Sequence, residues 1–194
     1  MEIKWYGVYR WYGQDCIFDL PRDLLNKQGV YLWTIPFEGR YLTYYVGETH
    51  RFAQRFNGHL RDYQSGVYRV YDPQRFAQGD AKTPIWGGTW KRDRRDPKYK
   101  LEFTRDYEKW SMIIHDFLGH MRIFLAPFET DEHTRMRLEA SVVAHLQAQG
   151  KLMMEQDSIA DTLKTGARCS NESPISITMV CAEPILGFPK SLVI

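Results

Sequence analysis

The chain is poor in cysteine and in long apolar runs, and each shortage argues against a class of protein. Its 194 residues include three cysteines, Cys16, Cys169 and Cys181, and none of them forms a C-x-x-C pair. Scattered cysteines argue against a disulfide framework or a zinc knuckle and are typical of a reducing compartment. No apolar run approaches the ~20 residues that cross a bilayer, and MEIKWYGVYR at the start is too polar for a signal peptide. We therefore expect a soluble, cytoplasmic protein without a membrane partner.

A large net charge and modular DNA-binding motifs are also lacking. The net charge is +2, so the total neither requires nor excludes a polyanionic partner, and the clustering of charges matters more. No segment resembles a zinc finger, a helix-hairpin-helix or a helix-turn-helix. The chain does contain 43% hydrophobic and 14% aromatic residues, which is enough to build a packed core in a domain of this length.

Strand and helix patterns are mixed along the chain. Alternating, β-branched or aromatic runs predict strands, and apolar residues at helical spacing predict helices. The expected strands cover residues 2–10, 29–35, 41–47, 120–128 and 175–185, and the expected helices cover 19–27, 50–63, 105–118 and 132–149. The pattern predicts a single domain of the α+β (mixed α/β) class.

The second and third expected strands flank PFEGR, which supplies Pro and Gly for a turn and so predicts a hairpin. If the register is symmetric about Glu38, Tyr31 lies opposite Tyr45 and Gly29 lies opposite Gly47. Opposite residues share one face of a sheet, with Cβ atoms roughly 4.5–5.5 Å apart, and the glycines would let a ligand or another backbone come close. The tyrosine pair is either a stabilising cross-strand contact or part of a site.

A basic stripe follows the hairpin. Arg51, Arg55 and His59 are spaced four residues apart, so they share one side of the expected helix, next to its apolar side. Such a stripe is either a solvated basic face or a set of cations directed at a phosphate beside the tyrosines.

Glu139 is the one carboxylate on an apolar helical stripe, which it shares with Met136, Val143 and Leu146. An ionised carboxylate among apolar neighbours needs a cation, since burying it alone costs several kcal/mol or raises its pKa. The cation is either an arginine such as Arg55 or a divalent metal. Mg²⁺ is commonly bound by one carboxylate together with substrate phosphate and waters.

These features occur in a characteristic order: GVY at 29–31, YVG at 45–47, Arg55 ten residues after Tyr45, His59 four residues later, and Glu139 on a late helix. Taken together they resemble the GIY-YIG nuclease family, which includes homing endonucleases, some type II restriction enzymes and the incision domain of bacterial excision repair. Both triplets have Val in place of Ile. The resemblance is close over residues 28–63 and loose over 120–147.

The resemblance implies a fold in which a small central antiparallel sheet is flanked by helices, and it implies a division of the chain and a set of roles. Residues 29–172 would form the nuclease domain with an insertion at about 64–104, preceded by an extension at 1–28 and followed by a strand and tail at 173–194. The implied catalytic residues are a general base (Tyr31), a tyrosine that arranges water and phosphate (Tyr45), a cation on the scissile phosphate (Arg55), a supporting imidazole (His59), the ligand of a single Mg²⁺ or Mn²⁺ (Glu139) and the family's late asparagine (Asn171).

The chemistry agrees with these roles. A phenol of pKa about 10 is a poor base at neutral pH, so Tyr31 would need nearby cations to favour its ionised form. Arg55 and a bound metal would supply them and would also stabilise charge on the phosphate. A tyrosine acting as a covalent nucleophile is an alternative.

The densest basic segment, KRDRRDPKYK at 91–100, follows WGGTW in the expected insertion. We expect it to contact nucleic acid, unless it is a solvated loop with internal ion pairs. The expected nucleic-acid-binding residues are Arg51, Lys91, Arg92, Arg94, Arg95, Lys98 and Lys100.

The expected activity is metal-dependent hydrolysis of phosphodiester bonds by an endonuclease of the restriction or phage-encoded kind. The substrate would be DNA, with RNA as the other candidate. A monomer with one active site would nick, whereas a symmetric homodimer could cut both strands. The alternative function is a catalytically inactive module of this fold that binds nucleic acid or a protein partner.

Overall fold

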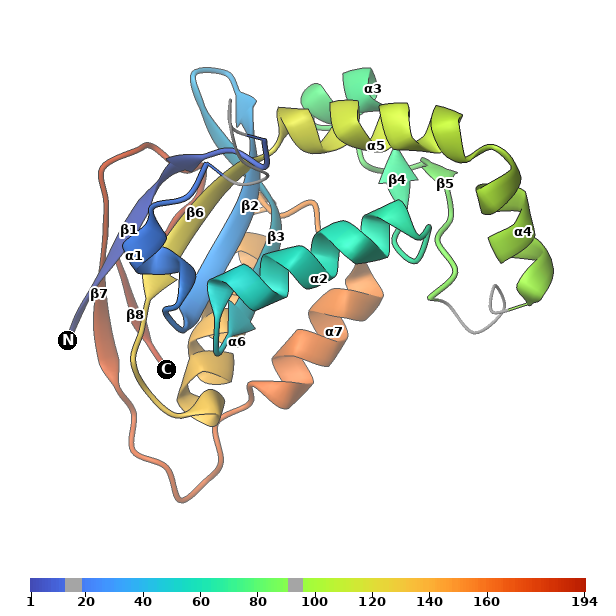
Figure 1. The fold of residues 1–194 in the computed structure, drawn as a ribbon. Coiled ribbons are helices and arrows are strands. Elements are labelled where there is room, and N and C mark those ends of the chain that lie inside the picture. The colour runs from blue at the N-terminus through green and yellow to red at the C-terminus, as the bar shows by residue number, and fades with distance from the viewer. Residues whose placement is uncertain (13–18, 91–95) are drawn as a thin grey trace. The chain divides into compact units, whose positions relative to one another are not determined.

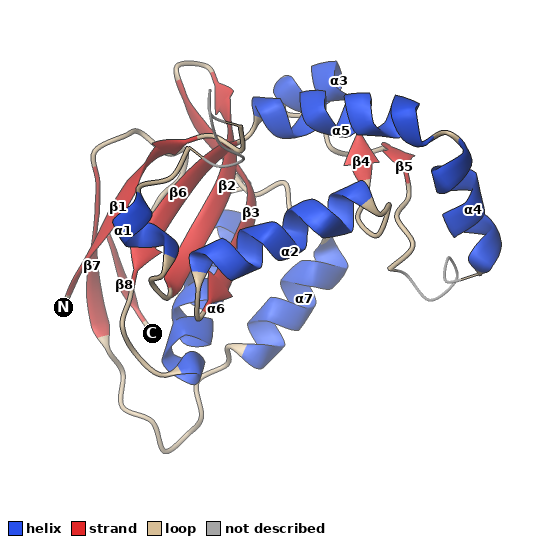
Figure 2. Cartoon of the chain, in the orientation of Figure 1, coloured by secondary structure: helices blue, strands red, loops and turns tan. Residues whose placement is uncertain are grey.

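The computed structural model describes residues 1–12, 19–90 and 96–194. Within them the chain forms two compact units. The first unit combines Met1–Phe52 with Arg122–Ile194, and the second is the continuous segment Ala53–Met121. Strands and helices are mixed (Figure 2), so the expected mixed class is confirmed. In the described ranges, every helix is too short or too polar to pass through a bilayer.

A six-stranded sheet forms the centre of the first unit (Figure 1). Its strands in spatial order are β3 (Arg40–Thr49), β2 (Gly29–Phe37), β6 (Arg122–Pro127), β1 (Glu2–Tyr9), β7 (Ser176–Cys181) and β8 (Ser191–Val193). β1 pairs with β7 in parallel, while the other neighbours are antiparallel. The prediction of a small antiparallel sheet was therefore wrong in two respects. The sheet is larger, because β7 and β8 extend it beyond β1, and the pairing of β1 with β7 is parallel.

The hairpin of β2 and β3 is present, but the predicted register is wrong. The turn holds two residues, Glu38 and Gly39, and both have positive φ (49° and 73°), as a type I′ turn requires. The register then shifts between Trp33 and Thr34 of β2, where β3 carries one extra residue, Tyr44. This β-bulge moves every pair near the open end of the hairpin by one further position.

The core of the first unit explains the run of apolar residues in β2. This strand lies between β3 and β6, and its residues from Gly29 to Ile35 are all buried. Val30 and Leu32 belong to a core cluster that includes residues of α6 (Glu132–Ala148) and α7 (Gln156–Thr165). Tyr31 and Trp33 alternate with them, so their side chains point to the opposite face.

Two helix predictions in the first unit were correct in place, and two elements were missed. The early helix is the single turn α1 (Arg22–Leu25), shorter than the expected range 19–27. α6 matches its prediction, and Asp131 caps it by accepting hydrogen bonds from the amide (2.8 Å) and hydroxyl (2.6 Å) of Thr134. The hydroxyl and amide bonds lower the pKa of Asp131 to about 2. α7 and β8 were not predicted.

The second unit is built on aromatic contacts. Its elements are α2 (Phe52–Gln64), β4 (Val70–Tyr71), α3 (Pro73–Ala77), β5 (Pro84–Trp86), α4 (Pro97–Arg105) and α5 (Tyr107–His120). The first residue of α2, Phe52, belongs to the first unit. Phe76 packs on Phe117 with ring centroids 4.5 Å apart, and Trp86 packs on Trp110 at 5.4 Å. α5 starts at Tyr107 and not at the expected residue 105, because residue 105 ends α4.

Candidate functional site

The structure brings the two motif tyrosines together, although not as opposite residues. Tyr31 lies opposite Gly47, and Tyr45 lies opposite Trp33. The rings of Tyr31 and Tyr45 remain neighbours, with centroids 6.1 Å apart and planes inclined by 36°. Tyr45 also packs on Trp33 at 5.0 Å. The tyrosines therefore belong to a continuous aromatic cluster on the hairpin, which agrees with the stabilising interpretation and leaves the site interpretation open to test.

The two motif glycines allow close approaches of different kinds. A Cβ on Gly47 would lie 2.9 Å from Cε1 of Tyr31 and closer still to its Cζ and hydroxyl oxygen. A Cβ on Gly29 would overlap the carbonyl oxygen of Ala126 on β6 and lie 2.9 Å from the ring of Phe52. Gly47 thus accommodates the phenol of Tyr31, and Gly29 accommodates a neighbouring strand. Tyr31 itself is fully buried.

Arg51 lies two residues after the end of β3 and is bound by Asn26 of the same unit. Its Nε and Nη2 both donate to Oδ1 of Asn26, at 3.1 and 2.7 Å, and the residue is exposed. Arg51 precedes the first residue of α2, so the expected three-residue stripe on one helix is reduced to Arg55 and His59.

Within the second unit, Arg55 and His59 lie one turn apart on α2 but differ in exposure. Arg55 is exposed, whereas His59 is 3% exposed. The Nδ1 atom of His59 is 3.1 Å from the hydroxyl of Tyr68. Burial, reinforced by the Arg55 guanidinium, holds the pKa of His59 well below its usual value of 6.5. His59 is therefore a neutral imidazole at pH 7, suited to accept or donate a hydrogen bond and unsuited to carry charge toward a phosphate.

This buried imidazole predicts an acid-sensitive stability. Because the pKa of His59 is lower in the folded state than in the unfolded state, the unfolded chain binds the extra proton first as the pH falls. The contribution of neutral His59 to the free energy of unfolding is therefore complete above about pH 6.5. It is lost as the pH falls below that value, by up to about 1.4 kcal/mol per pH unit. Urea denaturation between pH 7.5 and 5 should show this loss, and His59→Gln should flatten it. An identical pH slope in both proteins would contradict the assignment.

Glu139 lies at the border of the buried side of α6. Val143 and Leu146, which share its predicted stripe, are buried, whereas Met136 and Glu139 are partly exposed. Gly166, at the end of α7, packs against this region, since a Cβ there would overlap the Met136 carbonyl and lie 2.5 Å from Cβ of Ala140. The carboxylate is thus less enclosed than the sequence predicted, because α7 covers only part of this side of the helix.

The same helix carries a buried arginine that was not predicted. Arg135 is 4% exposed, and its guanidinium donates to Oε2 of Glu48 (3.0 Å), to Oε1 of Gln28 (2.9 Å) and to the carbonyl of Thr130 (2.6 Å). The sequence does contain a sign of this burial: Arg135 lies three residues before Leu138, so the two side chains share one side of α6, which is its most buried side.

The candidate asparagine lies in an exposed loop after α7. Asn171 is exposed, and the adjacent Glu172 pairs with His133 in the first turn of α6. His133 precedes Glu139 by six residues, or about 9 Å along a helix axis. The structure therefore associates this loop with the start of α6 and not with the turn that carries Glu139.

Most of the basic segment lies outside the described residues. Lys91, Arg92, Arg94 and Arg95 fall in the range 91–95, of which the structure gives no description. Lys98 and Lys100 are exposed on α4. Asp96 caps this helix by accepting from the Lys98 amide at 2.9 Å, and its other oxygen lies 3.8 Å from the Lys98 ammonium. Part of the charge of this segment is thus neutralised locally.

The first unit therefore carries Tyr31 on β2, Tyr45 on β3, Arg51 in the segment after β3 and Glu139 on α6, while α2 carries Arg55 and His59 in the second unit. The arrangement provides phenols, a partly buried carboxylate and exposed cations, which are groups that can bind and polarise a phosphate ester. No family model, curated protein or solved structure matches this chain.

Proposed function

We propose that the chain is a metal-dependent endonuclease of the GIY-YIG type that hydrolyses phosphodiester bonds in DNA. The observation that carries the proposal is the seating of the Tyr31 phenol over Gly47, beside Tyr45. The hairpin keeps a glycine where any side chain would displace this phenol, and it keeps a second tyrosine next to it. Packing of an aromatic ring over a facing glycine also stabilises sheets without any site, so the cleavage assay below distinguishes the two roles.

In this proposal the residues of the chain bind and orient the substrate. Tyr31 would accept the proton of the attacking water, and Tyr45 would orient the phosphate. Because the Tyr31 phenol is fully buried, this role requires a local opening of the aromatic cluster when substrate binds. Arg55 is exposed and would stabilise the charge that develops on the phosphoryl oxygens. His59 is neutral, so its role would be a hydrogen bond that positions a neighbouring group.

Glu139 is the residue that would hold Mg²⁺ or Mn²⁺. The fit rests on the donor set, since these ions prefer oxygen ligands and Mg²⁺ commonly keeps several waters beside one or two carboxylates. A partly exposed carboxylate on a well-formed helix meets that need, because the remaining positions must be open to water and phosphate. A bound ion would supply Lewis-acid stabilisation of the phosphate.

Contacts to the polymer would come from exposed cations. Arg51, whose guanidinium is fixed by Asn26, would bind a backbone phosphate beside the hairpin. Lys98 and Lys100 on α4 would add sequence-independent affinity. Binding of this kind weakens steeply as salt is raised, which separates phosphate contacts from base contacts.

The test is cleavage of supercoiled and linear DNA with Mg²⁺ or Mn²⁺, beside samples with EDTA. We expect metal-dependent cutting that falls by about 100-fold or more in Tyr31→Phe, because this change removes the proposed base but keeps the ring over Gly47. Glu139→Ala should abolish cutting by removing the metal ligand. A parallel assay on RNA of the same sequence tests the other candidate substrate.

Two matched controls separate a specific loss from a general one. Glu132→Ala removes an exposed carboxylate from the first turn of the same helix, and Tyr6→Phe removes an exposed phenol from β1. Both should cut DNA as the unaltered protein does. If DNA survives under all metal conditions while the protein still retards it in a gel, the nuclease proposal fails and the binding-module alternative replaces it.

A further inference from the structure

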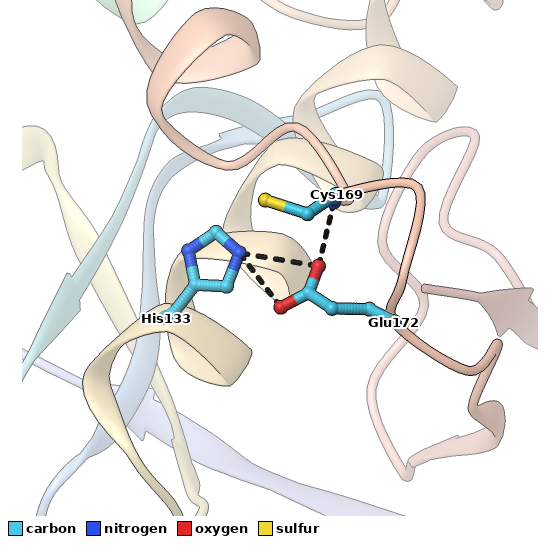
Figure 3. Close-up of side chains that lie close together, drawn as sticks. All are labelled: His133, Cys169 and Glu172. Carbon is cyan, nitrogen blue, oxygen red and sulfur yellow. Dashed lines mark hydrogen bonds and ion pairs between the residues drawn. The ribbon is translucent and has the colours of Figure 1, made fainter.

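Three different metal-ligating side chains meet between α6 and the loop that follows α7. His133 comes from the first turn of α6, and Cys169 and Glu172 come from the loop. One ligand atom from each lies within 4.8 Å of the other two. Figure 3 shows the thiol, the imidazole and the carboxylate around a common space. None of these side chains has a role in the proposed nuclease, so the cluster needs a separate explanation.

The loop is shaped before any ion binds. The amide of Glu172 donates to the carbonyl of Cys169 at 3.1 Å, and the amide of Cys169 donates back to Oε2 of Glu172 at 2.6 Å. This tight turn, C-S-N-E, brings its first and fourth side chains together, as C-x-x-C turns do in zinc sites. Arg137 fixes the turn from α6 by donating to the Ser173 carbonyl at 3.1 Å.

The two oxygens of Glu172 have different surroundings. Oε2 accepts from the Cys169 amide, lies 3.9 Å from Nη1 of Arg137 and is 3.3 Å from Nε2 of His133, whereas Oε1 is 3.1 Å from the same Nε2 and has no bond to the loop amide. If a carboxylate oxygen and an imidazole nitrogen both bound one tetrahedral Zn²⁺ ion, with bonds of roughly 2.0–2.2 Å, these two atoms would lie about 3.4 Å apart. An ion could therefore enter between Oε1 and Nε2 with a small separation of the pair, which gives up the contact of Oε2 with Nε2, while the bond from the Cys169 amide to Oε2 remains and orients the carboxylate.

The thiol determines which ion fits. A tetrahedral ion with a Zn–S bond of about 2.3 Å would hold the sulfur about 3.5 Å from Nε2, and Cys169 is exposed, so rotation of its side chain can close the remaining gap. Mg²⁺ selects oxygen ligands, whereas one sulfur, one imidazole nitrogen and one carboxylate oxygen together suit Zn²⁺.

We propose that His133, Cys169 and Glu172 form a Zn²⁺ site with solvent as the fourth ligand, which ties the loop after α7 to the start of α6. On binding, the Cys169 thiol releases its proton and His133 coordinates through a deprotonated Nε2. Because binding of this kind releases protons, affinity should fall as the pH is lowered. The site is separate from Glu139, so the proposal holds whether or not the chain is a nuclease.

Cobalt titration tests the site without reference to catalysis. Co²⁺ is added to untagged, reduced protein that carries Cys16→Ser, so that Cys169 and Cys181 are the remaining thiols. We expect equimolar binding with a thiolate-to-cobalt charge-transfer band, displaced by Zn²⁺. Cys169→Ser should abolish the band, and His133→Gln should weaken binding by at least 10-fold. Cys181→Ser, a change at a half-buried residue of β7, should leave the band intact, as should Glu139→Ala.

A second measurement does not depend on the spectrum. Zn²⁺ should slow tryptic cleavage after Arg168, the exposed residue next to Cys169, and Cys169→Ser should remove that protection. Circular dichroism checks that each variant keeps its fold. Absence of a thiolate band in the folded protein, or a band that survives Cys169→Ser and disappears in Cys181→Ser, would overturn the proposal.

Discussion

Replacing Arg135 by methionine is expected to lower the free energy of unfolding of the first unit by about 3–5 kcal/mol. The guanidinium is the donor for Glu48, Gln28 and the Thr130 carbonyl, and it is almost fully buried. Its removal leaves a carboxylate with a side chain 19% exposed and the Gln28 amide oxygen without this donor, while the Thr130 carbonyl still accepts from Nε2 of Gln28 at 3.1 Å. Urea denaturation, followed by fluorescence of the tryptophans in this unit, measures the loss.

Burial, and not the mere presence of an ion pair, is the cause of this effect. Lys27→Met removes the cation of another pair in the same unit, Lys27–Glu129 at 3.5 Å, whose side chains are 50% and 59% exposed. It should cost less than about 1 kcal/mol. Adding Glu48→Gln to Arg135→Met should recover part of the loss, because no uncompensated charge then remains. Equal losses for Arg135→Met and Lys27→Met would contradict this account.

Gly47→Ala is expected to lower the free energy of unfolding by about 1–3 kcal/mol. The added Cβ would occupy the space of the Tyr31 phenol, which is fully buried and cannot simply turn aside. Under the proposed function, the same displacement should remove DNA cleavage. Thermal unfolding and the cleavage assay measure the two effects.

Two further variants test whether the clash with the Tyr31 phenol causes the loss of stability in Gly47→Ala. Gly58→Ala adds a methyl group within α2 where no atom lies within 4 Å, so it should stabilise the protein by about 0.5–1 kcal/mol through helix propensity. In a Tyr31→Leu background, Gly47→Ala should cost markedly less, because the clashing atoms are gone. A cost that is the same in both backgrounds would show that the glycine serves another purpose.

Local features of the fold were predictable, and pairings between distant segments were not. The hairpin follows from two β-rich runs around a Pro–Gly turn, and α6 follows from its periodicity and the acidic residues at its start. The bulge at Tyr44 could not be foreseen, since nothing in the sequence of β3 marks which residue is left unpaired. The parallel pairing of β1 with β7 joins strands from the two ends of the sequence and leaves no local signal.

In the candidate site, too, local features were predictable and contacts between distant segments were not. The tyrosines were expected to be neighbours and are, because they lie on one hairpin. Buried cations were missed, since Arg135 and Arg137 occur in a helix whose apolar stripe appeared to run through Glu139 instead. The meeting of His133 with Glu172 depends on how the loop after α7 returns to α6, a tertiary feature that residue spacing does not encode.

The order of strands in the sheet has a consequence for biosynthesis. β1 is made first, yet its neighbours in the sheet are β6 and β7, and the ammonium of Met1 donates to the Ser176 carbonyl 175 residues later. At roughly 5–20 residues per second, β1 waits on the order of ten seconds or more for that partner. The continuous segment 53–121 leaves the ribosome during this interval. Before β6 and β7 emerge, Ile3 and Trp5, which are buried in the finished sheet, belong to a strand without its partners, and such a strand is prone to aggregation.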